Sequence, residues 1–394
     1  MAGWVEKRGT NKWRLNVPGG TGPDGRRKVY RRTIEATSER EAKKQLDIFS
    51  AEVQKGQYVE PSKLTFAEFS QQWLESKKDL APKTRHRYKR MLESRILPAM
   101  GHMKLESIKP FHIMQFYENL QESGIREDGK EGTLSPTTIL HHHRLLVTIF
   151  NAAVKWQILL TNPAARVEAP KVPRKPAACY DENDIAALLE ALDSEELKHR
   201  VLVYIALFTG LRRGEIMGLE WQDVDFDNSL LHVRRSSQYL PGQGSITKEP
   251  KNETSKRVIS IPSFVMALIK QYKTQQSQER LKLGDLWQGS DRLFTTWDGK
   301  PGHPEWPSQW FSKFIKKHKL PHLPFHGLRH TAATMLINQN IPLKNISGRL
   351  GHANPATTGA IYSHYLQSAD KAISDKLENA YQHIMQKDTK KRQV

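Results

Sequence analysis

Cysteine is almost absent from this chain: Cys179 is the single one among 394 residues. One thiol can form neither an intrachain disulfide nor a zinc site made of thiolates, so both are excluded as supports of the fold. A reducing compartment suits such a sequence. Cys179 is interpreted as a linker or packing residue rather than as a nucleophile.

Long apolar stretches are also missing. No run of about 20 apolar residues, the length needed to cross a bilayer, occurs in the sequence. The first residues, Met1–Lys7, lack the apolar core of a secretion signal. We therefore expect no membrane partner and a cytoplasmic location.

Negative charge is scarce. The sequence has 61 lysines and arginines against 42 aspartates and glutamates, which gives a formal net charge of +19 and a pI near 9.8. A strongly basic protein favours a polyanionic partner, and nucleic acid is the commonest one. The chain is long enough for two or three domains with their own cores.

Residues 1–60 have the pattern of a small β-rich module. Lys12–Val17 alternates between polar and apolar residues, Lys28–Ile34 does so in part, and the glycine-rich stretch 19–25 between them is typical of a turn. A capping-box pattern at Ser38 then predicts a helix. We expect a three-stranded sheet laid into a DNA groove, although a solvated charged face would have the same pattern. The cations expected to bind DNA are Arg26, Arg31 and Arg32.

Residues 64–160 are predicted to form a helical bundle. Apolar residues recur at helical spacing in four segments, which begin near Thr65, Pro82, Ile113 and Pro136. These apolar stripes are expected to form the core. The second segment also carries a run of cations that we expect to follow DNA phosphates, although such runs are usually just solvated: Lys83, Arg85, Arg87, Lys89 and Arg90.

The proline-rich stretch 161–176 is typical of an extended linker between domains. Residues 177–394 are then expected to be mostly helical, with one short antiparallel sheet made by Leu230–Val233 and Arg257–Ile261. The expected fold class is multidomain, mainly α with small β-sheets.

Two motifs resemble metal-binding sequences, but neither has the geometry or the ligands of a metal site. Consecutive helical residues point about 100° apart, so His141, His142 and His143 cannot converge on one ion from one helix. Read as an EF-hand loop, the segment starting at Asp223 has Asn228 at the glycine position and Arg234 at the final glutamate position. We expect no metal and no cofactor.

Four fragments of the second half share one chemistry: Thr209–Arg212, His326–Arg329, Leu350–His352 and Ile361–His364. They offer two guanidinium groups that match the oxygens of a phosphate, two imidazoles that move protons near neutral pH, and a phenol that can form a covalent intermediate. No carboxylate cluster accompanies them, which argues against a two-metal nuclease. The set predicts phosphoryl transfer without a metal ion.

The order and spacing of these fragments resemble the catalytic boxes of the tyrosine recombinases, also called the phage integrase family. The likeness is closest to integrases of temperate phages and conjugative transposons. The first box continues through Arg213–Ile216 and Leu219–Trp221, and a tyrosine follows His352 by ten residues. The resemblance covers nearly the whole chain. It implies an arm-type DNA-binding domain at 1–60, a core-binding domain at 64–160 and a mixed α/β catalytic domain at 177–394.

The resemblance also implies a role for each site residue. Tyr362 is the expected nucleophile, with Tyr365 as its rival. Arg212 and Arg329 are expected to bind the phosphate and its transition state, and His326 to assist proton transfer. His352 is expected to hydrogen-bond the phosphate or to orient the tyrosine.

Two further expectations concern the surroundings of Arg212. A helix should start at this residue, so that a phosphate would also meet a helix amino terminus. Glu215 is interpreted as a partner that holds an arginine in place, not as a catalyst.

The proton donor for the leaving 5′-oxygen is a β-hairpin lysine in the family. Pro250–Arg257 resembles that hairpin, with Lys251 at the matching position. The family usually has threonine after this lysine, whereas this chain has Asn252, so Lys248 and Lys256 remain open.

The sequence thus predicts a site-specific DNA recombinase, an integrase that integrates and excises a mobile element through a 3′-phosphotyrosyl intermediate, without ATP. Expected partners are core and arm attachment sites in double-stranded DNA, three further copies of the chain in a homotetramer, and a DNA-bending protein or excisionase. Two alternatives remain: a dimer resolvase with the same chemistry, and a DNA-binding regulator that has kept only the fold. The tail after Tyr362 is expected to pack either on its own domain or on a neighbouring protomer.

Overall fold

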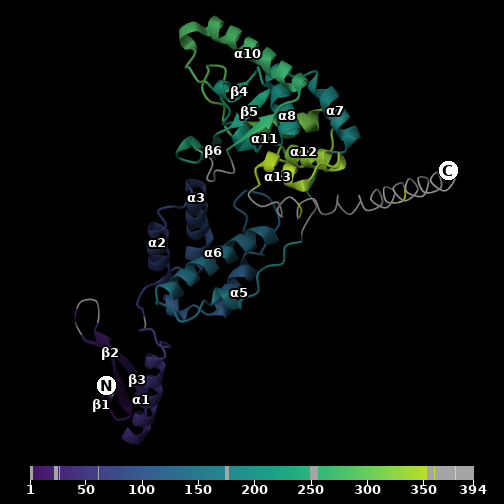
Figure 1. The fold of residues 1–394 in the computed structure, drawn as a ribbon. Coiled ribbons are helices and arrows are strands. Elements are labelled where there is room, and N and C mark those ends of the chain that lie inside the picture. The colour runs from purple at the N-terminus through teal and green to yellow at the C-terminus, as the bar shows by residue number, and fades with distance from the viewer. Residues whose placement is uncertain are drawn as a thin grey trace, which may run out of the picture. The chain divides into compact units, whose positions relative to one another are not determined.

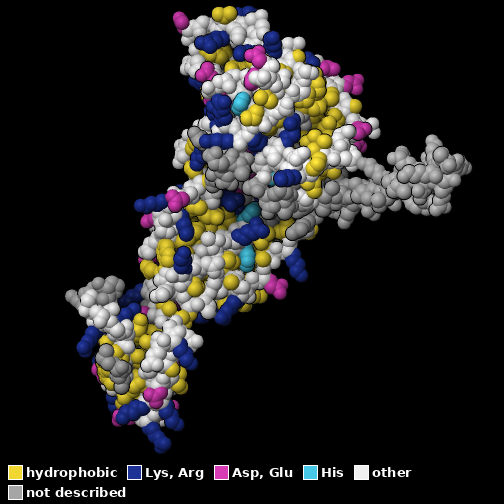
Figure 2. Space-filling view, in the orientation of Figure 1, with side chains coloured by type: hydrophobic (Ala, Val, Ile, Leu, Met, Phe, Trp, Pro, Cys, Tyr) yellow, Lys and Arg dark blue, Asp and Glu magenta, His cyan; other side chains and the backbone are white. Residues whose placement is uncertain are grey.

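The protein is described by a computed structural model that covers residues 3–21, 25, 27–60, 62–173, 177–248, 256–352, 359 and 378. The chain divides into two compact units, Met1–Pro173 and Arg174–Val394 (Figure 1). Lysine and arginine side chains are spread over the visible surface of both units, as Figure 2 shows. Within the described ranges, no helix combines the length and the apolar character that a bilayer span requires.

The amino-terminal module is the three-stranded sheet and helix that the sequence predicts. Its antiparallel sheet has the order β1-β2-β3, and α1 packs on one face of it. The side chain of Ser38 accepts a hydrogen bond from the Glu41 amide and so caps the helix. Phe49 of α1 is fully buried against Leu15 and Val17 of β2. The elements are β1 (Trp4–Lys7), β2 (Lys12–Thr21), β3 (Arg27–Glu35) and α1 (Glu39–Gln54).

The second part of this unit is a helical bundle with a separate core. All four expected helices are present, and Thr65 begins the first with a complete capping box. The second helix continues through a π-helical turn, so its apolar stripe is carried by three consecutive elements. Phe66, Phe69, Trp73 and Phe150 are fully buried at the centre. The elements are α2 (Phe66–Ser76), α3 (Pro82–Met91), η1 (Leu92–Ile96), α4 (Leu97–Met100), η2 (Leu105–Ser107), α5 (Pro110–Asn119), α6 (Pro136–Lys155) and η3 (Ala164–Arg166).

The expected linker at 161–176 is shorter in the structure. The side-chain amide of Asn162 donates to Val147 O at 3.0 Å and to Asn151 Oδ1 at 2.8 Å, both on α6. Ala164 and Val167 are buried in the bundle core. The first part of the stretch therefore belongs to the bundle, because its apolar side chains and the Asn162 amide find partners there.

The described part of the second unit is mostly helical, with a main core, a smaller apolar cluster between α12 and α13, and α8 packed against α10 and α12 (Figure 1). The helices bounded within its described residues are α7 (Glu182–Leu192), α8 (Leu197–Thr209), α9 (Arg213–Ile216), η4 (Trp221–Asp223), α10 (Ser263–Leu283), η6 (Gly284–Leu286), α11 (Trp306–Lys317), α12 (Gly327–Asn338) and α13 (Leu343–Leu350).

The second unit contains more strands than the sequence predicts. The predicted pairing is present, with β5 (Leu230–Val233) antiparallel to β8 (Arg257–Ser260) and Leu231 opposite Ile259. A short third strand, β4 (Val224–Asp225), adds to β5. The hairpin of β6 (Ser236–Leu240) and β7 (Gly244–Lys248) was not predicted, because its strands are polar and short.

Candidate active site

The close approach of two helix ends brings together segments that are far apart in sequence. Gly210 ends α8 with φ +67°, and a Cβ at this position would lie 2.6 Å from Leu350 Cδ2. Glycine satisfies both conditions, because it adopts this backbone readily and has no Cβ. The Thr209–Arg212 segment therefore lies directly against the Leu350–His352 segment.

The third segment joins the same point through Arg329. This residue is in the first turn of α12 and is 3% exposed. Its Nη1 donates to the carbonyl oxygen of Gly210 at 2.7 Å. His326 is the residue immediately before α12, so the two predicted site residues of this segment stand at the start of one helix.

Arg212 is fixed in place while part of its side chain remains open to solvent. Its Nη1 donates to Glu215 Oε1 at 2.8 Å and its Nη2 to Gly351 O at 2.9 Å, and 39% of the side chain is exposed. Glu215 thus holds an arginine, as the sequence suggested. The neighbouring Arg213 turns away to α11, where it donates to Ser308 Oγ at 2.8 Å.

The expected helix amino terminus at Arg212 needs correction. A helix does begin there, but α9 has only 4 residues, and the backbone N–H of Arg212 donates to Glu215 Oε2 at 2.9 Å. A helix of one turn has little macrodipole, and this first donor is already used. The guanidinium, not the backbone, is what Arg212 offers to an anion.

Both predicted site imidazoles are neutral at pH 7. Burial, together with the charges of His330 and Arg329, lowers the pKa of His326 to about 4, although the side chain is partly open to solvent. Burial and the charges of Arg329 and Arg212 lower the pKa of His352 to about 4. A neutral imidazole keeps one nitrogen as an acceptor, so these rings can accept protons or hydrogen bonds.

Other predicted site residues lie outside the described part of the chain, or at the ends of strands. Tyr362, its rival Tyr365, Lys251 and Arg26 lie outside the described residues. Of the two other candidate lysines, Lys248 ends β7 and Lys256 directly precedes β8. The structure brings together Arg212, His326, Arg329 and His352, since Arg212 and Arg329 are close enough to lower the pKa of both imidazoles.

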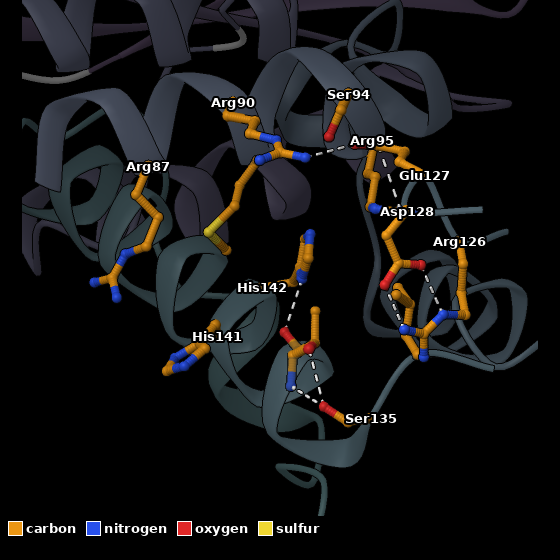
Figure 3. Close-up of a pocket in the computed structure, with 13 residues that line it drawn as sticks. Arg87, Arg90, Ser94, Arg95, Arg126, Glu127, Asp128, Ser135, His141 and His142 are labelled. Carbon is orange, nitrogen blue, oxygen red and sulfur yellow. Dashed lines mark hydrogen bonds and ion pairs between the residues drawn. The ribbon is translucent and has the colours of Figure 1, made fainter. Parts of the chain in front are cut away.

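The predicted DNA-binding cations of α3 have different surroundings. Arg87 and Arg90 line a cavity of about 460 Å³, where Glu127 lies 3.2 Å from Arg90 Nη2 and 3.5 Å from Arg95 Nη2 (Figure 3). The side chains of Lys83 and Lys89 are exposed. All four cations are exposed to solvent, but Arg90 already pairs with Glu127 and Lys89 with Glu93.

Arg85 departs from the expectation. Its guanidinium donates to Leu74 O at 2.9 Å and to Lys77 O, and so caps the last carbonyls of α2. This arginine ties two helices together, because the orphan carbonyls at a helix carboxyl end need donors.

The strand arginines of the amino-terminal module also differ from one another. Adjacent residues of a strand point to opposite faces of the sheet. Arg32 points to the α1 side, where its guanidinium lies 4.3 Å from the Phe49 ring centre and its Nη2 lies 2.6 Å from a Glu52 carboxylate oxygen. Arg31 is exposed, on the other face. The expectation that both present free cations to DNA is corrected for Arg32.

The three consecutive histidines of α6 have separate surroundings. His142 donates from Nδ1 to Thr138 O at 2.9 Å, whereas His143 Nδ1 is hydrogen-bonded to Tyr117 Oη at 2.8 Å. Figure 3 shows His141 turned away from His142. Of the side chains that the structure describes, no three His, Cys, Asp or Glu residues are arranged to hold a metal ion.

The sequence reasoning missed Arg257 as a part of this site. Its side chain is 8% exposed and is bonded to Glu215, the same carboxylate that holds Arg212. Its only sequence signal was its place as the last residue of the predicted hairpin, where the predicted strand Arg257–Ile261 begins.

Comparisons with known proteins agree with this geometry. The model of the Phage integrase family matches residues 179–368, and that of the Phage integrase, N-terminal SAM-like domain, matches residues 65–121. A tyrosine recombinase XerC-like protein of Caldanaerobacter subterraneus subsp. tengcongensis is 28% identical over 380 residues, which cover 91% of this chain and 94% of that protein. The ICEBs1 integrase of Bacillus subtilis is 26% identical over 275 residues, 70% of this chain and 72% of that protein.

Solved structures share the fold. The Tn1549 transposon integrase in complex with transposon right end DNA has a TM-score of 0.66 at 21% identity and covers 80% of this chain and 100% of its own. A lambda integrase tetramer bound to a Holliday junction has a TM-score of 0.55 at 16% identity, over 91% of this chain and 94% of its own. The chain belongs to the phage integrase family and is a tyrosine recombinase, an enzyme that cuts and rejoins DNA.

Proposed function

We propose that this chain is the integrase of a mobile element, which integrates and excises that element by site-specific recombination through a 3′-phosphotyrosyl intermediate. The observation that carries the proposal is the meeting of Arg212, His326, Arg329 and His352 around the end of α8. Three chain segments are held together there by Arg212–Gly351 and Arg329–Gly210 hydrogen bonds.

The reaction consists of two transfers of the phosphoryl group, first from the DNA 5′-oxygen to Tyr362 and then from Tyr362 to the 5′-oxygen of the exchanged strand. The Tyr362 oxygen attacks the scissile phosphorus, and its proton passes to His326. The bond from phosphorus to the 5′-oxygen breaks, and this oxygen takes a proton from Lys251 to leave as a 5′-hydroxyl. In the second transfer the 5′-hydroxyl of the exchanged strand gives its proton back to Lys251 and attacks the phosphotyrosine. The bond from phosphorus to the Tyr362 oxygen breaks, and this oxygen takes back the proton from His326. The energy of the phosphodiester is kept in the intermediate, so the cycle needs no ATP.

The two arginines are proposed to bind the non-bridging phosphate oxygens. Negative charge grows on these oxygens in the phosphorane-like transition state, and preorganised donors stabilise it most. Arg212 suits this role because Glu215 and Gly351 fix its guanidinium while part of it stays exposed.

The neutral imidazoles support the proposed proton transfers. A free phenol has a pKa of about 10, so the tyrosine needs a base and positive surroundings. Burial and the nearby cations lower the pKa of His326 to about 4, which keeps the ring available as a proton acceptor. A bound phosphate would offset these cations and favour the protonated ring that must later return the proton. His352 is proposed to hydrogen-bond the phosphate or to orient Tyr362.

The partners follow from the reaction. Two duplexes must be cut and joined, so four protomers are proposed to act on core sites. The amino-terminal module is proposed to bind separate arm sites, with a DNA-bending protein or an excisionase to set the direction. Exposed cations of α3, Lys83, Arg87, Lys89 and Arg90, are proposed to follow the core phosphates. The reaction would take place on DNA in the cytoplasm of a bacterial host.

A nicked attachment-site duplex tests the proposal. The nick lets the short 5′-hydroxyl fragment diffuse away after cleavage, so the covalent intermediate accumulates. An SDS-stable protein–DNA adduct, formed with a chelator present and absent in the Tyr362→Phe variant, is the expected result. Specific binding without any adduct would favour the regulator that has kept only the fold.

A further inference from the structure

Arg257, at the start of β8, is bound on every nitrogen of its guanidinium. Nε donates to Arg349 O at 2.8 Å, and Nη1 and Nη2 donate to the two carboxylate oxygens of Glu215 at 3.2 and 2.9 Å. Only 8% of its side chain is exposed. The two-pronged arginine–carboxylate arrangement is the strong and geometrically specific form of this pair.

The carboxylate that Arg257 binds is also the one that positions Arg212. Burial alone would raise the pKa of Glu215, but the hydrogen bonds and charge of Arg257, together with Arg212, lower it below its ordinary value. Glu215 is therefore an anion shared by two arginines. Removing one partner of a buried pair leaves the other charge poorly compensated. Without Arg257, the carboxylate would depend on Arg212 alone.

Arg257 also supports the turn that carries His352. Gly351 has φ +69°, and a Cβ there would lie 2.7 Å from Arg257 Nη1, so the guanidinium fills the space beside this glycine. The Gly351 carbonyl in turn accepts from Arg212. The preceding Arg349 donates to Phe208 O at 2.8 Å and to Ser260 O at 3.1 Å, which ties the turn to α8 and β8.

We propose that Arg257 is a positioning residue for strand cleavage: it holds Glu215 and the Arg349–Gly351 turn, and through them it sets Arg212 and His352 against the scissile phosphate. This role rests on the function proposed above for Arg212 and His352. Arg257 acts through these residues, because its Nε, Nη1 and Nη2 all donate to protein acceptors.

The first test separates cleavage from binding. The single-turnover rate of adduct formation on a nicked core-site duplex is measured for Arg257→Gln and Arg257→Lys at saturating protein, with DNA affinity from gel shifts. A catalytic group that is displaced by about 1 Å can slow the chemical step by about 100-fold. We expect that loss for Arg257→Gln, a smaller loss for Arg257→Lys, and affinity close to that of the unsubstituted protein. An unchanged rate, or a loss confined to affinity, would overturn the proposal.

A matched control separates positioning from general stability. Arg292 is a second arginine of low exposure in the same unit, with Gly218 O and Thr247 Oγ1 as acceptors and Glu220 as its ion-pair partner at 3.7 Å. Arg292→Gln is expected to lower the melting temperature much as Arg257→Gln does, with near-normal cleavage by the folded protein. Equal losses of cleavage in the two variants would mean that Arg257 only stabilises the fold. Should Arg257→Gln fail to fold, the comparison uses Arg257→Lys.

Two further measurements ask which group Arg257 serves. If it acts through Arg212, its loss must cost much less in an Arg212→Lys background, since residues that act as a unit are not additive. A full additive loss overturns the proposal.

The second measurement uses a duplex with sulfur at the scissile 5′-position, which releases a thiolate that needs no proton donor. Arg257→Gln should remain slow on this duplex, and recovery of its rate would show that Arg257 serves the proton donor instead. If the unsubstituted protein forms no adduct on either duplex, the proposed function fails, and this proposal fails with it.

Discussion

The Arg212 guanidinium donates to the carbonyl oxygen of Gly351 at 2.9 Å, across 139 residues of sequence. The first and third sequence boxes are therefore parts of one structure. Leu350, next to Gly351, packs against Gly210, which precedes Arg212 by two residues. The position of the exposed guanidinium thus depends on the last turn of α13.

The first prediction concerns the nucleophile. Tyr362→Phe should abolish the covalent adduct and leave DNA binding nearly intact, because the change removes a single oxygen. Tyr365→Phe is the matched control and should still form the adduct. SDS gels of the nicked-duplex reaction measure both. Loss of the adduct in Tyr365→Phe alone would move the nucleophile to that residue.

The second prediction concerns Arg212 and Arg329, the two arginines that are proposed to bind the phosphate. Arg212→Ala and Arg329→Ala should each slow cleavage by roughly two to three orders of magnitude, the usual cost of losing a donor to a developing oxyanion. Arg213→Ala should slow it far less, because Arg213 is turned to Ser308 on α11. Single-turnover adduct formation is the measurement.

Folding needs a separate check for the second of these variants. Arg329 is 3% exposed and bonds Gly210 O, so its loss also removes a buried contact. Thermal unfolding of each variant therefore accompanies the rates. Similar cleavage rates for all three alanine variants would mean that the arginines hold DNA only in a general way.

The third prediction concerns pH. Burial and neighbouring cations lower the pKa of His326 and of His352 to about 4, so the neutral, functional form persists as pH falls below 6.5. The second-order rate constant of cleavage reports the ionisation of the free enzyme. As the pH is lowered, this rate constant should therefore begin to fall only well below pH 6. A fall with a midpoint near 6.5, with the protein still folded and DNA affinity unchanged, would contradict the depressed pKa values.

The fourth prediction concerns Glu127 in the helical bundle. Its carboxylate lies 3.2 Å from Arg90 and 3.5 Å from Arg95, where a DNA phosphate would otherwise meet these cations. Glu127→Gln should bind core-site DNA more tightly, by several-fold, with a steeper dependence on salt because more counterions are released. Gel-shift titrations at several salt concentrations measure both changes.

Glu75→Gln is the matched control for this prediction. It makes the same change of charge at an exposed carboxylate of α2, which accepts a hydrogen bond from the neutral side chain of Gln71 at 3.1 Å. Its effect on DNA affinity should therefore be smaller. Equal effects of the two substitutions would mean that only the net charge of the bundle matters.

The sequence predicted the elements whose pattern is local. The apolar stripes of the bundle helices, the start of the first one at Thr65, the Ser38 cap and the pairing of β5 with β8 are confirmed. The β6–β7 hairpin was missed, because its strands lack a clear alternation. Its glycines at 242 and 244, both with positive φ, were the available signal.

What the sequence could not predict was the direction and pairing of the charged side chains. Arg85 and Arg32 looked like DNA contacts, but one caps α2 and the other packs on Phe49 and pairs with Glu52. Arg257 looked ordinary, but it shares Glu215 with Arg212. Such pairings depend on where distant segments meet, and the spacing of residues along one element does not contain this information.

The fifth prediction concerns the amino-terminal module. A chain that starts near Lys63 keeps the bundle and the catalytic unit, so it should still cleave a core-site duplex. It should lose high-affinity binding to flanking arm DNA, and with it efficient recombination of full attachment sites. Gel-shift titration of both chains on flanking DNA, at two salt concentrations, measures the loss. Equal affinity of the two chains would give the module another role, such as contact with a partner protein.

The two neighbouring strand arginines provide a sharper comparison within the full-length chain. Arg31 is exposed on the sheet face opposite α1, so Arg31→Ala should weaken binding to arm DNA and reduce the salt dependence by about one counterion. Arg32 pairs with Glu52 and stacks on Phe49 and Tyr58, so Arg32→Ala should instead lower the thermal stability of the module. The two variants carry the same change of charge at adjacent positions. Equal losses of arm affinity in the two, with stability unchanged, would mean that the net charge of the module matters and not the face of the sheet on which an arginine lies.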